Sequence, residues 1–213
     1  MSENVKRRYE APRRAERAAA TRSAVLAAAR ELFVARGYAG TAVGDIAAKA
    51  GISVDTVYSS VGRKPVLLRE LVETSLSGQD HAVPAAERDY VIRVRAAPTA
   101  AEKIALYAEA ITSIHGRLAP VFLALRDAAV SDRDCAALWR EIAERRARNM
   151  LDFAADLRAT GDLRDDLTDR QVADVVWSTN AVEYWVLLVH ERGWTPEEFR
   201  GWLTDSWTRL LLA

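Results

Sequence analysis

The segment from Thr41 to Lys64, TAVGDIAAKAGISVDTVYSSVGRK, constrains the fold more than any other part of this 213-residue chain. Its first half places small apolar residues at three- and four-residue spacing, as on one face of a helix: Val43, Ile46, Ala47 and Ala50. Thr41 is positioned to cap this helix. Gly51 is positioned to end it, because glycine adopts the left-handed backbone conformation at little steric cost. The segment therefore begins with a short amphipathic helix and a sharp turn.

A second short helix is predicted from Ser53 to Ser60. Ile52 follows the turn as an apolar plug, and the Ser53 side chain can accept hydrogen bonds from the first free amides. One face is apolar and carries Val54, Val57 and Val61. The other face carries short or hydrogen-bonding side chains, namely Ser53, Asp55, Thr56, Tyr58 and Ser59. Such a short helix is not stable alone in water, so its apolar face must pack on neighbours. The pair has the form of a DNA-reading helix-turn-helix.

The distribution of charge agrees with a nucleic-acid partner at this end. The net charge is zero, yet residues 1–64 hold twelve Lys or Arg against six Asp or Glu, which leaves an acidic excess in residues 65–213. Residues 1–14 are interpreted as a flexible basic arm. The basic residues here either bind phosphate or belong to a solvated tail, and they are Lys6, Arg7, Arg8, Arg13, Arg14 and the nearby Arg17.

Composition and motifs exclude several classes of protein. The single cysteine, Cys135, excludes an intramolecular disulfide and a cysteine-rich zinc site. No apolar run reaches membrane-spanning length, and the basic start lacks the apolar segment of a secretory signal. The chain has three histidines and no GxSxG, HExxH or glycine-rich phosphate loop. We therefore expect a cytoplasmic protein that is not an enzyme, with no cofactor, no metal and no membrane partner.

Helical periodicity elsewhere predicts an all-α fold of about nine helices. A first helix is expected from Ala15 to Arg36, packed on the helix-turn-helix to give a domain over residues 15–64. Pro65 suits the first turn of a further helix that reaches about Ser77. The following stretch, from Gly78 to Pro98, is expected to form a long loop or an irregular extension.

Capping signals predict four further helix starts in the larger domain, residues 65–213. Each start has an acidic or amide residue three positions later, and the four are Thr99, Ser131, Thr168 and Thr195. Residues 117–120 are expected to break the helix 99–116 from another at 118–130. Gly161 and Gly193 are expected to end helices.

The last two predicted helices, 168–192 and 195–212, carry more apolar surface than one chain of this size can easily bury. We therefore expect them to pair with their copies in a two-fold dimer, as a four-helix bundle. The alternative is an ordinary central helix in a monomer. The residues expected at the dimer interface are Val175, Val182, Trp185, Val186, Val189, Phe199, Trp202, Leu203, Trp207 and Leu210.

The order of motifs between about Thr21 and Val72 can be compared with a known family. The segments ELFVARGYAGTAVGDIAAKAGIS, TVYSSV and GRKPVLL follow one another here. In this order they resemble the TetR family of bacterial transcriptional regulators. The resemblance implies an N-terminal three-helix DNA-binding domain, a larger helical domain for ligand binding and dimerisation, and homodimers on a palindromic operator in double-stranded DNA.

The same resemblance implies a repressor that a small hydrophobic or amphipathic effector releases from DNA. Three alternatives stay open. An activator of the same family has the same motifs, a helical-bundle protein-interaction module has similar helices, and an enzyme is the least favoured because nothing positions a nucleophile.

The resemblance also implies individual DNA contacts. Tyr58 and Lys64 would contact phosphates, and Thr41 would do so from the start of its helix. The groove-facing side of the second short helix would carry Ser53, Val54, Asp55, Thr56 and Ser59. Asp55 either accepts from a cytosine amine or is a helix N-terminal charge without a DNA role, and we favour the second. The chain departs from the family pattern at Gly44, Ser59, Ser60 and Val61.

The family likeness finally implies a ligand cavity in the larger domain. Its candidates are aromatic or polar residues on helices that otherwise build the core: His115, Phe122, Arg126, Trp139, Arg146, Met150, Trp177, Asn180 and Tyr184. Each has an alternative interpretation as a core residue, and Arg146 lies in a basic run typical of a solvated face. Apolar walls with few polar groups suit a moderately hydrophobic organic ligand.

Overall fold

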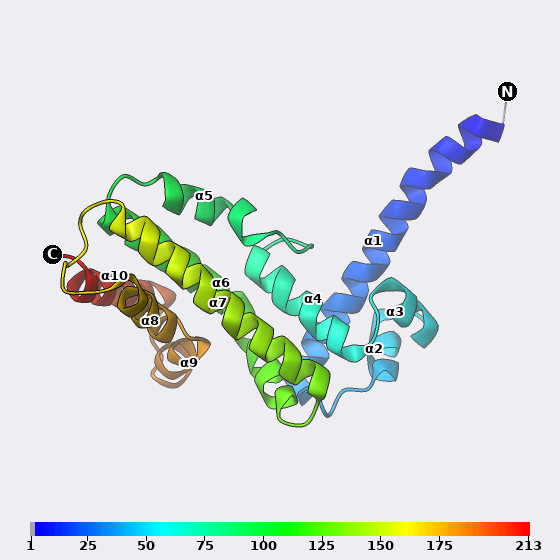
Figure 1. The fold of residues 1–213 in the computed structure, drawn as a ribbon. Coiled ribbons are helices and arrows are strands. Elements are labelled where there is room, and N and C mark those ends of the chain that lie inside the picture. The colour runs from blue at the N-terminus through cyan, green and yellow to red at the C-terminus, as the bar shows by residue number, and fades with distance from the viewer. Residues whose placement is uncertain (1–2) are drawn as a thin grey trace.

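The computed structural model describes the backbone of residues 3–213 and the side chains from residue 14 onward. The N-terminal domain consists of α1 (Glu3–Arg36), α2 (Val43–Ala50) and α3 (Val54–Ser60). Helix α1 projects far beyond the body, and only its C-terminal part packs on α2, α3 and α4 (Figure 1). The small core of this domain joins buried Phe33 of α1, Ile46 of α2 and Val57 of α3.

The first helix is longer than the sequence pattern predicts. It begins at Glu3 and not at Ala15, and so it runs through Pro12. Residues 1–2 lie outside the described part of the chain. So do the side chains of four of the arm's basic residues, namely Lys6, Arg7, Arg8 and Arg13.

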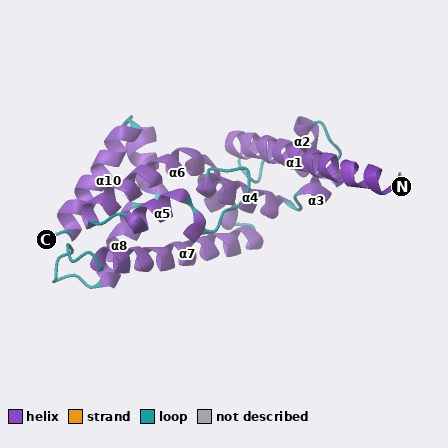
Figure 2. Cartoon of the chain, turned by 90° about the horizontal axis from the view of Figure 1, so that it is seen from above, coloured by secondary structure: helices purple, strands orange, loops and turns teal. Residues whose placement is uncertain are grey.

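The larger domain is built on two long helices that lie side by side, α6 (Ala100–Ala129) and α7 (Arg133–Arg158). One side is covered by α4 (Lys64–Ser77), a 3-10 turn (Ala85–Glu87) and α5 (Asp89–Ala96). The other side is covered by α8 (Asp169–Thr179), α9 (Val182–Trp185), a π-helical turn (Val186–Glu191) and α10 (Pro196–Leu211) (Figures 1 and 2). Within residues 3–213 every regular element is helical, which confirms the predicted all-α fold.

Three of the four predicted helix caps in this domain are confirmed. The hydroxyls of Thr99, Thr168 and Thr195 accept hydrogen bonds from amides three residues later. The prediction at Ser131 is wrong by one residue, since Asp132 caps α7 through the amides of Asp134 and Cys135. An aspartate carboxylate accepts two amides at once and outcompetes the neighbouring hydroxyl.

Three other predicted boundaries are wrong, each for a tertiary reason. Helix α6 runs unbroken through Pro120, because burial along its 30 residues outweighs one missing hydrogen bond. The expected irregular stretch contains α5, which packs on α6. The predicted helix 168–192 divides after Thr179, where Asn180 turns its side chain to distant partners.

Candidate nucleic-acid interface and interior cavity

The reading face of α3 is held in place by caps and by one buried anchor. Gly51 closes α2 in the left-handed conformation with φ 69°, as predicted. The Ser53 hydroxyl accepts the Thr56 amide at 3.1 Å and so caps α3. Val57 is fully buried in the domain core. These constraints fix the side of α3 that faces away from the protein.

That outer side carries the residues predicted to face DNA. Ser53, Asp55 and Ser59 are exposed, Val54 is 38% exposed and Tyr58 is 47% exposed. Thr56 is half-buried. Val54 was also expected to share the inner apolar face, but only Val57 and the half-buried Val61 pack inward. The exposed set mixes hydroxyl, phenol and apolar groups, which are suited to base edges and phosphates.

Thr41 does not occupy the position predicted for it. Its side chain is buried, and its hydroxyl lies 2.9 Å from the Gly37 carbonyl oxygen and 3.2 Å from that of Leu32. It does not cap α2, whose N-cap is Ala42 with its amide bonded to the Asp45 carboxylate. The hydroxyl joins the end of α1 to the helix-turn-helix, so the predicted phosphate contact from Thr41 is not supported by this geometry.

Lys64 lies at the start of α4 and is partly enclosed by its own chain. Its ammonium nitrogen is 3.9 Å from the centroid of the Tyr38 ring. Burial lowers the pKa of Lys64, and the nearby Asp132 carboxylate opposes that change. The ammonium donates no hydrogen bond to any residue that the structure describes, so its N–H groups stay available to a phosphate.

The Tyr38 phenol is a structural contact that the sequence pattern did not predict. Its hydroxyl donates to Asp132 Oδ2 at 2.9 Å and so ties the DNA-binding domain to the turn between α6 and α7. Burial raises the pKa of Tyr38, while the Cys135 amide and the Tyr38 hydroxyl lower the pKa of Asp132. The two residues are 94 positions apart, so no local spacing signals the pair.

A cavity of about 150 Å³ lies inside the larger domain. Residues of α4, α5, α6 and α7 line it, together with the break between α8 and α9. Its walls are mostly apolar, and the apolar lining includes Val72, Leu76, Val94, Ile111, Ile114, Leu118, Phe122, Ile142 and Phe153. Such a space suits a small organic molecule.

Five of the nine predicted ligand residues line this cavity: His115, Phe122, Arg146, Met150 and Asn180. The other four lie elsewhere. Trp139 packs on Phe122 with centroids 4.6 Å apart, Tyr184 packs on Trp202 at 5.4 Å, Arg126 faces Asp127 near the surface, and Trp177 supports Arg146 from outside. Helical spacing alone does not separate cavity-lining side chains from their neighbours.

Asn180 is the centre of a buried polar cluster in the cavity wall. Its Nδ2 donates to the Tyr107 hydroxyl at 2.9 Å and lies 3.4 Å from Met150 Sδ. Its Oδ1 accepts a hydrogen bond from Arg146, and its backbone oxygen lies 3.0 Å from His115 Nε2. The cluster joins α6, α7 and the α8–α9 break at one point.

His115 is neutral in this setting. Because the Asn180 oxygen is an acceptor, His115 Nε2 carries the proton, and Nδ1 is buried without a hydrogen-bond partner among the residues that the structure describes. Burial lowers the pKa of His115 to about 4, with the Asn180 carbonyl partly opposing it. Phe199 and Trp185 flank the ring at 6.1 Å between centroids.

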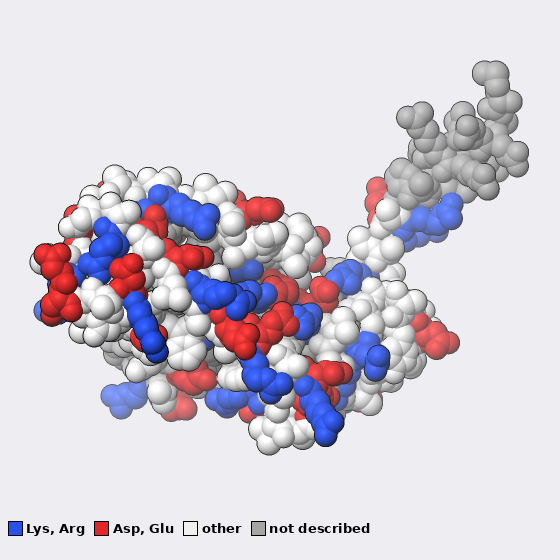
Figure 3. Space-filling view, in the orientation of Figure 1, with Lys and Arg blue, Asp and Glu red and all other residues white. Residues whose placement is uncertain are grey.

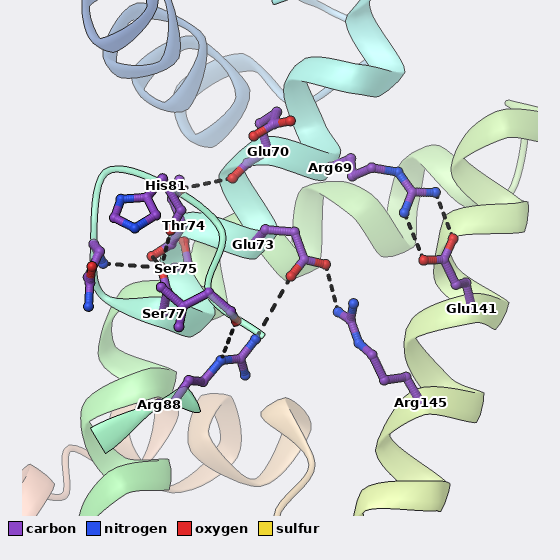
Figure 4. Close-up of polar contacts among 12 residues, drawn as sticks. Arg69, Glu70, Glu73, Thr74, Ser75, Ser77, His81, Arg88, Glu141 and Arg145 are labelled. Carbon is purple, nitrogen blue, oxygen red and sulfur yellow. Dashed lines mark hydrogen bonds and ion pairs between the residues drawn. The ribbon is translucent and has the colours of Figure 1, made fainter. Parts of the chain in front are cut away.

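A second polar cluster borders the cavity beside α4 (Figure 4). Glu73 of α4 accepts from Arg145 of α7 at 2.7 Å, and its other oxygen lies 3.9 Å from Arg88. Arg69 and Glu141 form a bidentate pair at 2.7 and 2.8 Å one turn away. Both Arg88 and Arg145 line the cavity. The cavity wall is therefore bonded directly to the helix that follows the DNA-binding domain.

Comparison with known proteins identifies the family of the helix-turn-helix. Residues 25–71, which contain it, match the family model described as bacterial regulatory proteins, tetR family. The N-terminal domain of the chain is therefore of the TetR type. No curated protein sequence matches the chain.

Solved structures share the fold of this chain over nearly its whole length. NalD of Pseudomonas aeruginosa, the secondary repressor of a multidrug efflux pump, has a TM-score of 0.70 at 19% identity, covering 92% of this chain and 98% of NalD. FadR of Bacillus subtilis, solved with stearoyl-CoA, has 0.69 at 21% identity, covering 86% and 96%. A proposed regulator of Saccharomonospora viridis, solved with choline, has 0.69 at 19%, covering 90% and 97%. At these identities the likeness establishes the fold.

The chain buries half of the residues expected at a dimer interface within its own core. Val182, Trp185, Phe199, Leu203 and Trp207 are each less than 5% exposed. Leu210 is exposed, and four others are half-buried, namely Val175, Val186, Val189 and Trp202. These five, with exposed Trp177, Tyr184 and Leu187, are apolar residues of α8–α10 that stay available to a partner.

The charged surface of the described residues is mixed. Figure 3 shows Lys and Arg interspersed with Asp and Glu over the larger domain, and basic side chains on the projecting part of α1. Arg14 and Arg17 are exposed there. Among the residues described, no helix combines the length and apolarity needed to cross a bilayer, and no group of acidic, His and Cys side chains is arranged to hold a metal ion.

Proposed function

We propose that this chain is a transcriptional repressor of the TetR family that binds a palindromic operator as a homodimer. The observation that carries the proposal is the outer side of α3, which is exposed although the short helix is anchored by Val57 and capped by Ser53. A rigid helix with free hydrogen-bonding groups is the element that enters a major groove. The exposed side chains of Arg14 and Arg17 on α1 belong to the same domain as α3 and can bind the phosphate backbone.

The dimer supplies the second reading helix. The available apolar side chains of α8–α10 include Tyr184, Leu187 and Leu210, which a two-fold partner would cover. Two α3 helices would then lie in successive major grooves about one helical turn or more apart.

Release of DNA follows from the position of the cavity. Its wall includes Val72 and Leu76 of α4, and Arg145 bonds Glu73 on the same helix. A hydrophobic or amphipathic effector in the cavity therefore contacts the element that joins the two domains. It shifts the equilibrium toward a released dimer by its differential affinity for the two states.

The proposal is tested first by selection of binding sites from random-sequence duplex DNA. We expect enrichment of an inverted repeat, and light scattering of the free protein is expected to give the mass of a dimer. The proposal is overturned if the free protein has the mass of a monomer and the selection enriches no sequence.

Lys64→Ala then tests the site on the enriched duplex. Loss of one phosphate contact in each protomer, and so of two in the dimer, is expected to weaken binding and to reduce the slope of log affinity against log salt by about two. Arg170→Ala, which removes an exposed cation on α8, is the matched control and should leave both quantities unchanged. Equal effects of the two substitutions would contradict the assignment of α3 and the start of α4 as the DNA site.

A further inference from the structure

The cavity wall carries more positive charge than its own carboxylates neutralise. Three arginines line it at partly buried positions, namely Arg88, Arg145 and Arg146. Glu73 is the one carboxylate bonded to this set among the described residues, and it is shared by Arg88 and Arg145. The set therefore retains an excess of two positive charges.

The remaining ionisable groups of the lining do not remove that excess. Asp156 is paired with the buried Lys103 ammonium at 2.9 Å. Asp152 and Arg95 are both exposed at the rim and offset one another. His115 is neutral, and burial raises the pKa of Tyr107, so its phenol stays uncharged.

Arg146 has no carboxylate within ion-pair distance in the part of the chain that the structure describes. Its guanidinium stacks over the Trp177 ring at 5.1 Å, and Nη2 donates to the Trp177 carbonyl at 2.9 Å and to Asn180 Oδ1. These bonds use one end of the guanidinium and leave Nε and Nη1 without an acceptor among the described residues. Burial lowers the pKa of Arg146, yet an arginine stays charged.

Arg146 is partly buried, and the one carboxylate that acts on it, Glu183, lies beyond ion-pair distance. A guanidinium in this position with no counter-ion in contact is costly, and an incoming anion restores the balance. We infer that the cavity takes a small organic acid, with its carboxylate at Arg146 and its apolar part along Ile111, Ile114 and Phe122 of α6. A cavity of about 150 Å³ holds one aromatic ring or a short alkyl chain. This inference rests on the proposed function, since it names the chemical class of the effector.

The test measures binding to the full-length protein by calorimetry at pH 7.5, without DNA. The probes are three matched sets that differ only in the head group: benzoate, benzyl alcohol and benzylamine; phenylacetate, 2-phenylethanol and 2-phenylethylamine; hexanoate, 1-hexanol and hexylamine. We expect at least one acid to bind about tenfold or more tightly than its alcohol, and every amine to bind most weakly. The inference is overturned where no acid exceeds its alcohol or where an amine binds best.

Substitutions assign the preference to one side chain. Arg146→Gln is expected to reduce the acid-to-alcohol ratio of affinities to about one while the alcohol still binds, which also shows that the cavity is intact. Arg146→Lys should restore part of the ratio because it restores the charge. Arg148→Gln, on the exposed side of the same helix, is the control and should keep the wild-type ratio. A wild-type ratio in Arg146→Gln would overturn the assignment.

The outcomes separate this inference from the proposed function. Where an acid binds in the expected pattern but leaves operator affinity unchanged, the ligand class stands and the release step is wrong. Where the protein binds its operator but no acid exceeds its alcohol, the regulator stands and the ligand class is wrong.

Discussion

At the scale of single residues, the larger domain contains polar side chains that hydrophobic burial alone does not explain. Asn180 and His115 are each 3% exposed, and both are bonded within the cluster that joins α6, α7 and the α8–α9 break. Buried polar groups destabilise a fold unless they are hydrogen-bonded, so this cluster constrains the arrangement of three elements around the cavity.

The neutral His115 predicts a specific pH dependence of stability. The pKa of His115 is about 4 in the folded state against 6.5 when unfolded, so the unfolded chain binds the extra proton between these values. Stability is therefore complete above pH 6.5 and falls as the pH is lowered toward 4, by about 3 kcal/mol in total from this group. Urea unfolding at pH 7.5, 5.5 and 4.5 measures the loss.

His115→Gln separates this contribution from that of the acidic residues. Glutamine can still donate to the Asn180 carbonyl but does not titrate, so the variant should lose about 3 kcal/mol less than wild type over the same pH interval. Parallel curves for wild type and His115→Gln would show that His115 does not carry the effect.

At the scale of elements, the sequence predicts well what depends on neighbours along the chain. The caps at Ser53, Thr99 and Thr168 are local hydrogen bonds between residues three apart, and Gly51 is a local backbone requirement. Each was confirmed because the deciding partner lies within one turn.

Elements that depend on distant partners were predicted poorly. Pro120 lies inside a continuous helix because of the helices packed around it, and Asn180 ends α8 where its side chain bonds Tyr107, 73 positions away. For the same reason the cavity could be expected from the family, but only part of its wall could be predicted. Arg88 and Arg145 were absent from the predicted set, although their pairing with Glu73 defines one side of the cavity.

Two glycines of the helix-turn-helix predict opposite effects of the same substitution. Gly44 is helical and exposed, and an added Cβ would meet no atom within 4 Å, so Gly44→Ala should stabilise by about 0.5–1 kcal/mol. Gly51 has equal space but a φ of 69°, so Gly51→Ala should destabilise by about 1–2 kcal/mol. Urea unfolding measures both, and changes of the same sign would contradict this account of the two conformations.

At the scale of the whole molecule, the DNA-binding domain is tied to the larger domain at three separate places. Arg30 of α1 donates to the Ser75 hydroxyl of α4 at 3.1 Å and to the Arg117 carbonyl of α6. Arg22 of α1 pairs with Glu70 of α4, and Tyr38, just after the end of α1, bonds Asp132 in the α6–α7 turn. The orientation of α3 relative to the cavity is therefore set by polar contacts that a ligand or DNA can redistribute.

The Tyr38–Asp132 tie can be measured with a double-mutant cycle. Tyr38→Phe keeps the ring that packs on Phe33 and supports Lys64, and removes only the hydroxyl. Asp132→Asn keeps an N-cap for α7. A hydrogen bond to a carboxylate predicts a coupling free energy of about 1–2 kcal/mol between the two substitutions, measured by urea unfolding.

The same cycle distinguishes a tie between domains from a local stabiliser. If Tyr38–Asp132 holds the DNA-binding domain against the α6–α7 turn, Tyr38→Phe should increase amide exchange of α2 and α3 more than that of α6. If amide exchange becomes faster by the same factor in all helices, the bond contributes only to global stability. If the two substitutions are strictly additive in the cycle, Tyr38 and Asp132 do not interact. If amide exchange increases mainly in α2 and α3, this contact holds the helix-turn-helix against the larger domain. A change at the α6–α7 turn would then alter the orientation of the helix-turn-helix.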